Sequence, residues 1–216
     1  MPKERAPDDT ATDLLVDELI DGSPAELRNR FQTAQAQMLV TIQVLRSGLE
    51  SSRKVAWKHH MDIWNMALFL NMASLDLSMT IEHVVFERVE WRRKLQARNL
   101  ATLVYEVTED HTQLLGKPIR ENLQALDLIS KFEGPLKAAK KPLDQFWKEH
   151  QPRLKTIRNY TGAHRAHDCS EFIEMIDEIN PHEIYRIGMD LGNLLIACGA
   201  FLQDVMTIAA STYPKK

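Results

Sequence analysis

Apolar side chains recur every third or fourth residue along several long stretches of this chain, and this spacing constrains the fold more than any other feature. One stretch follows Ser23-Pro24 and consists of Leu27, Phe31, Ala34, Met38, Ile42, Leu45 and Leu49. Another follows Asn180-Pro181 and consists of Ile184, Ile187, Leu191, Leu194, Cys198, Phe201 and Val205. Such spacing lines one face of an α-helix. Glycine is scarce, 8 of 216 residues, and no sustained apolar–polar alternation is visible, so the sequence predicts an all-α protein.

Further helices and their ends can be placed from the same pattern. Ser23 is expected to be the N-cap of the first long helix, with Pro24 at its first position and Glu26 completing a capping box. Ser47-Gly48 and Ser51-Ser52 are expected to loosen its end. Three more stripes mark helices around Trp64–Met79, Leu100–Val107 and Ile119–Leu126. Gly134-Pro135 is expected to close the last of these, and Pro142 and Pro152 to begin two more helices.

Long helices joined by short links predict an up-and-down helical bundle with additional helices. We expect a disordered tail over residues 1–12 and a single helical-bundle domain over residues 13–213. The N-terminus has no apolar signal core, and the purely apolar runs are short, which predicts a cytoplasmic protein without a membrane span. Cys169 and Cys198 lack metal-type spacing and are expected to pack as small, reduced apolar groups.

Charge is unevenly distributed between residues 137 and 183. Residues 137–165 contain eight Lys or Arg and two acids, whereas residues 168–183 contain six acids and no Lys or Arg. The net charge of -3 argues against a general nucleic-acid coat. The basic segment could form a local anion site beside an acidic wall, or the two segments could be solvated faces that pair with each other. Both interpretations stay open at this point.

The most informative short motif is Ile157-Arg158-Asn159-Tyr160-Thr161-Gly162-Ala163-His164-Arg165. Arginine is a permanent cation whose forked donors suit phosphate, and histidine can exchange a proton near neutral pH. A helix starting at Pro152 would turn Leu154, Ile157 and Thr161 inward. Arg158 and His164 would then lie about 60° to either side of that stripe and about 9 Å apart along the axis. Both can border one shallow site, particularly if a second copy closes over it.

The series Arg158-Asn159-x4-His164 resembles the R-x4-6-H motif of the HEPN superfamily. These proteins are α-helical bundles, usually dimeric, and many are metal-independent ribonucleases of toxin–antitoxin and other defence or stress systems. The resemblance implies that His164 exchanges a proton with the ribose 2′-hydroxyl and that Arg158 stabilises charge on the phosphate. Asn159 would hold the phosphate or orient His164. We assign the basic neighbours Lys155 and Arg165 to substrate binding.

The resemblance implies a homodimer that binds RNA and, as a toxin-like member, a cognate antitoxin or other protein partner, with no cofactor. The alternative is a non-catalytic helical interaction or adaptor protein. In that case Arg158 would pair with Asp168 or Glu171, and His164 would be a core histidine. His164, His167 and Glu171 could also face one way as metal ligands, but the Glu-x-x-His pairs of a di-iron bundle are missing, so no metal is predicted.

Overall fold

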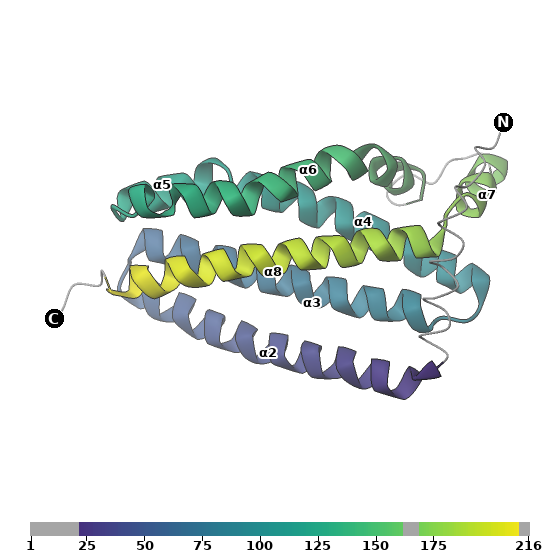
Figure 1. The fold of residues 1–216 in the computed structure, drawn as a ribbon, viewed down its shortest axis with the longest axis horizontal. Helices are drawn as coiled ribbons and strands as arrows, with labels where there is room; N and C mark the ends of the chain where they lie inside the picture. Colours follow the sequence, from purple (N-terminus) through teal and green to yellow (C-terminus); the bar gives the residue numbers. More distant parts are fainter. Residues whose placement is uncertain (1–21, 162–168, 212–216) are drawn as a thin grey trace.

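The computed structural model describes residues 22–161 and 169–211. Within these ranges every regular element is an α-helix and no strand occurs. The helices are α2 (Pro24–Lys54), α3 (Lys58–Phe86), α4 (Glu90–Leu114), α5 (Lys117–Ala125), α6 (Ile129–Thr161), α7 (Cys169–Asp177) and α8 (Pro181–Ser211). The long helices lie lengthwise in an elongated bundle (Figure 1). The predicted all-α helical bundle is confirmed, and the predicted tail over 1–12 lies outside the described residues.

Helices α3 and α8 form the centre of the bundle. Helix α8 packs against α3, α4 and α6, while α2 packs chiefly against α3. As a result α2 and α6 lie on opposite sides of α8 (Figure 1). The described helices share one apolar core, and the expectation of a single domain over 13–213 stays a prediction.

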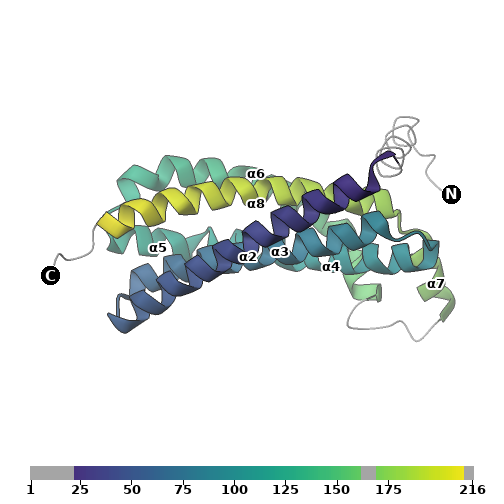
Figure 2. The same ribbon diagram turned by 90° about the horizontal axis from the view of Figure 1, so that it is seen from below.

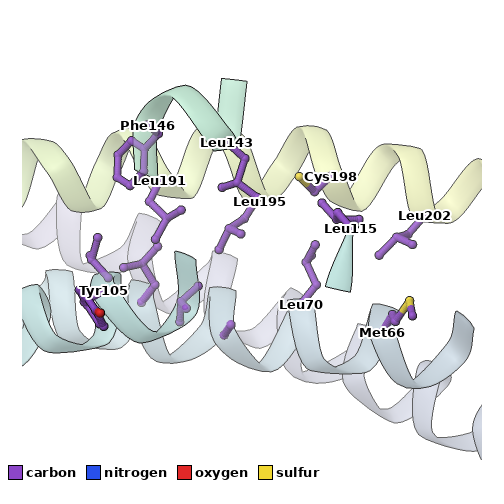
Figure 3. Close-up of a cluster of buried hydrophobic side chains, with 14 of the residues drawn as sticks. Met66, Leu70, Tyr105, Leu115, Leu143, Phe146, Leu191, Leu195, Cys198 and Leu202 are labelled. Carbon is purple, nitrogen blue, oxygen red and sulfur yellow. The ribbon is translucent and has the colours of Figure 1, made fainter. Parts of the chain in front are cut away.

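The core is built from the stripes that the sequence displays. Leu191, Leu195, Cys198 and Leu202 of α8 are buried and point into the bundle, where Leu70 and Met66 of α3 are also drawn (Figure 3). The thiol of Cys198 is fully buried, as the sequence predicted, and burial raises its pKa to about 11. The side chain of Cys169 lies outside the described residues.

Helix α2 ends later and begins differently from the prediction. Gly48 does not loosen the helix, which continues to Lys54, because the ring of Trp64 packs directly on the glycine. Ser23 is the N-cap and Pro24 follows it, but the Ser23 side chain makes no capping hydrogen bond. The predicted capping box is wrong because Glu26 instead accepts a hydrogen bond from Arg30, 2.6 Å away.

The prolines of α6 do not divide it, contrary to the sequence prediction. Helix α6 runs without a break through Pro135, Pro142 and Pro152, and Gly134 lies inside it rather than closing the preceding helix. A proline inside a helix leaves the carbonyl four residues earlier without its usual donor. All three prolines lie on exposed positions, where water can bond that carbonyl. The buried side of the helix therefore remains regular.

By length and composition alone, helix α8 is long and apolar enough to cross a membrane. The sequence analysis missed this because it looked for one unbroken apolar run, whereas Asp190 and Asn193 interrupt α8 before the apolar residues 194–202. Here α8 is a core helix with one exposed side. The cytoplasmic location therefore stays a prediction.

Candidate functional site

The motif region lies at the C-terminal end of α6. Leu154 and Ile157 point inward and are fully buried, as the predicted stripe requires. This buried side fixes the rotation of the helix and turns Lys155 and Asn159 to the exposed side. The side chain of Thr161 lies outside the described residues.

Arg158 is held on the surface by two residues of α4. Its Nε donates to Oε1 of Glu106 at 3.3 Å, and its guanidinium carbon lies 5.1 Å from the centre of the Tyr105 ring. Tyr105 is itself buried and packs against Trp147, with ring centres 5.0 Å apart. The Arg158 side chain is 38% exposed, so its remaining donors face solvent while one edge is engaged. The carboxylate that pairs with Arg158 in the described residues is thus Glu106. The adaptor alternative expected Glu171 or Asp168, and Asp168 lies outside the described residues.

Lys155 is adjacent to both Arg158 and Asn159 on the helix surface, because residues three and four apart on a helix are neighbours. Lys148 lies two turns earlier on the same line. Within the described part of the chain neither lysine forms an ion pair with a carboxylate. Together, three cations and one amide form a positively charged edge that can hold an anion such as a phosphate. The edge consists of Lys148, Lys155, Arg158 and Asn159.

The remaining motif residues, His164 and Arg165, lie outside the described residues, as do His167 and Asp168. The structure therefore brings Arg158, Asn159 and Lys155 together and does not place His164, to which the resemblance assigns proton transfer. In the ranges 22–161 and 169–211, no group of three His, Cys, Asp or Glu side chains has the arrangement of a metal site.

Two buried histidines were missed by the sequence analysis. His111 donates from Nδ1 to the carbonyl of Val107 at 2.7 Å and stacks on Phe69. Burial lowers the pKa of His111. His60 lies in the first turn of α3 and is buried next to the carbonyl of Ala209. Their positions on the inward stripes of α4 and α3 were the available signal.

A small polar cavity of about 370 Å³ lies between the start of α3 and α5. Nδ1 of His59 lies 2.8 Å from Oδ1 of the buried Asn122, whose amide nitrogen donates to the Pro118 carbonyl. Because the amide oxygen can only accept, Nδ1 of His59 carries the proton. These contacts hold α3 and α5 together, and the histidine acts there as a structural group.

A second feature is an apolar groove between α2 and α8, with α3 as its floor. It consists of two adjoining cavities of about 680 and 280 Å³, and Met38 and Ile196 line both. The only charged side chain among the described lining residues is Arg30. Ile196 is 72% exposed on the rim. An exposed apolar groove of this kind is typical of a protein-binding surface.

Comparison with known proteins gives no relative, since no family model, no curated protein and no solved structure matches this chain. The structure itself defines the class of fold, an all-α helical bundle. Function must be argued from the residues of the site.

Proposed function

We propose that the protein is a HEPN-like, metal-independent endoribonuclease of a defence, stress or toxin–antitoxin system, and that it binds RNA at the C-terminal end of α6. The observation that carries the proposal is the position of Arg158, half-exposed at the last turn of the helix and six residues before His164. An arginine that is oriented by an aromatic ring but still open to solvent is suited to phosphate.

The adjacent cations support an RNA substrate. Lys155 and Lys148 extend the positive edge along α6, so that phosphates on either side of the cleaved bond would be held as well. Asn159 offers both a donor and an acceptor at the same end of the helix. The chain as a whole is acidic, so the interaction would be local and would not coat long nucleic acids.

In the proposed reaction the 2′-oxygen attacks the neighbouring phosphorus while His164 takes the hydroxyl proton. The bond from phosphorus to the 5′-oxygen breaks, and that oxygen takes a proton from water and leaves as a 5′-hydroxyl, while the protonated His164 returns its proton to the solvent. The other product ends in a 2′,3′-cyclic phosphate. Arg158 stabilises the charge that develops on the phosphate oxygens. Glu106 holds the arginine in place before RNA binds, and the phosphate then replaces the carboxylate.

The proposal is tested with purified protein and single-stranded RNA in the presence of a chelator. The wild type should cleave the RNA, and Arg158→Ala should lose most of the activity. Arg153→Ala is the matched control, because Arg153 lies on the same helix but donates to the backbone carbonyl of Glu178. Intact RNA with the wild type, or equal loss in both variants, would count against the proposal.

The second candidate function is that of a non-catalytic interaction protein, which the apolar groove between α2 and α8 favours. A groove of this shape would accept an amphipathic helix from another protein. Under this function Arg158→Ala would leave partner binding unchanged, whereas a charge placed at Ile196 would abolish it.

A further inference from the structure

The side of α2 that faces away from α3 is exposed along its whole length. We call this the outer face of α2, and it consists of Thr33, Ala36, Val40, Val44, Ser47 and Ser51. Figure 2 shows α2 lying across the near side of the bundle, with no other described helix covering it. The residues recur at intervals of three and four, the spacing of a helix–helix seam.

The middle of this face is unusual for a solvated helix. No charged residue occurs between Phe31 and Leu45, although much of that stretch is exposed. Val40 is 62% exposed and Val44 is 60% exposed, and Val44 also lines the groove beside α8. The exposed side of a single surface helix normally carries charged residues. An uncharged seam continuous with an apolar groove indicates a covered surface.

We propose that the outer face of α2 binds the same face of a second copy of this chain, with the two helices antiparallel and Val40 at the two-fold axis. The seam is self-complementary in this register. Ala36 would lie opposite the partner's Val44, and Thr33 opposite the partner's Ser47. Small side chains near the axis allow the two helices to approach closely.

Charges at the two ends of the helix select the same register. With Val40 on the axis, Glu26 lies opposite the partner's Lys54 and Arg30 lies opposite the partner's Glu50. A slip that sets Ala36 opposite the partner's Val40 would instead set Glu26 against the partner's Glu50. Of these two registers, only the one with Val40 on the axis brings opposite charges together. Electrostatic complementarity therefore favours that register.

Within one copy, Arg30 donates to Glu26 at 2.6 Å and Arg46 donates to Glu50 at 3.0 Å. These pairs are exposed and therefore weak, so in the dimer their carboxylates can be shared with the partner's bases. Arg28, Arg46 and Arg53 lie roughly 120–140° around the helix from the outer face. Arg28 is turned toward the core side, where its guanidinium lies 4.0 Å from the centre of the Phe86 ring. The outer face itself carries no charge, and Glu26, Arg30, Glu50 and Lys54 flank it toward the two ends of the helix.

The area is sufficient for a stable dimer. From Glu26 to Lys54 the helix is about 40 Å long, and covering the groove rim as well makes the contact roughly 20 Å wide, or about 800 Å² for each copy. This matches the standard size of a specific interface. The inference keeps the predicted homodimer but moves its contact to α2, across the bundle from Arg158, and it is independent of the ribonuclease proposal.

The first test measures the mass of the full-length protein by sedimentation or light scattering at micromolar concentration. The wild type should be a dimer. Val40→Glu should raise the dissociation constant about tenfold or more, because two carboxylates would meet at the axis. Leu39→Glu is the matched control, since Leu39 is 51% exposed on the same helix but lies about 100° away from Val40. Circular dichroism should show unchanged helicity in both variants.

A charge exchange tests the register without touching apolar residues. Arg30→Glu should weaken the dimer, and adding Glu50→Arg should restore it, because the opposite charges then face each other again. The proposal is overturned by a monomeric wild type, by a Val40→Glu dimer as stable as the wild type, or by equal dissociation of the position 39 and 40 variants. Failure of Glu50→Arg to restore the Arg30→Glu dimer would likewise overturn the proposed register.

Discussion

Arg158 donates to Glu106 across 3.3 Å and thereby ties the last turn of α6 to the middle of α4. Both side chains are partly exposed, so the ion pair is weak and can open when a stronger anion approaches. The negative charge of Glu106 also opposes the approach of a phosphate. The ion pair between Arg158 and Glu106 therefore positions the arginine and also competes with a bound phosphate.

Removing that carboxylate should strengthen RNA binding. Glu106→Gln frees Arg158 and removes a repulsive charge, so the dissociation constant for single-stranded RNA should fall by about two- to fivefold at low salt. Fluorescence anisotropy with labelled RNA measures the change. Glu109→Gln, an acid one turn away on the same helix, is the control. Weaker binding by Glu106→Gln would contradict the assigned role.

The fold of the bundle could be predicted from sequence because its helices carry long apolar stripes. The continuity of α6 could not be predicted, because it depends on whether the carbonyl four residues before each proline faces water, and this is decided by packing. For the site, the outward position of Lys155 followed from the stripe of Leu154 and Ile157. The pairing of Arg158 with Glu106 depends on how α4 packs against α6, which no local pattern records.

Two glycines should respond in opposite directions to the same substitution. In Gly48→Ala the new methyl carbon would lie 2.6 Å from ring atoms of Trp64, so overpacking should cost about 1–3 kcal/mol of unfolding free energy. In Gly134→Ala the methyl group would meet nothing within 4 Å, and the higher helix propensity of alanine should add about 0.5–1 kcal/mol. Urea denaturation measures both. Similar effects at the two positions would contradict the contact between α2 and α3.

The stability of the bundle should fall in mildly acidic solution. Burial lowers the pKa of His111 below its value in the unfolded chain, about 6.5. Below pH 6.5 the unfolded state therefore binds more protons than the folded state. The contribution of His111 to the free energy of unfolding is complete above pH 6.5 and decreases as the pH falls below that value. The variant His111→Asn, whose amide can still donate to Val107, should lose less stability between pH 7.5 and 5.5. An equal loss in the variant would mean that His111 is not the group responsible.

Cys198 should be inert in the folded protein. Burial raises the pKa of its thiol to about 11, so the reactive thiolate is scarce at pH 8 and reagents cannot reach it. A Cys169→Ser variant isolates the reaction of Cys198 with Ellman's reagent. The thiol should react only when denaturant is added. Fast reaction under native conditions would show that α8 leaves the core.

The most direct test of the ribonuclease proposal examines the cleavage product of a 5′-labelled single-stranded RNA in the presence of EDTA. We expect the wild type to produce fragments ending in a 2′,3′-cyclic phosphate, and His164→Ala to produce none while retaining its helical circular dichroism. DNA of the same sequence should stay intact because it lacks the attacking 2′-hydroxyl. Uncut RNA with the wild type, or the same fragments with His164→Ala, would contradict the account and favour the interaction protein.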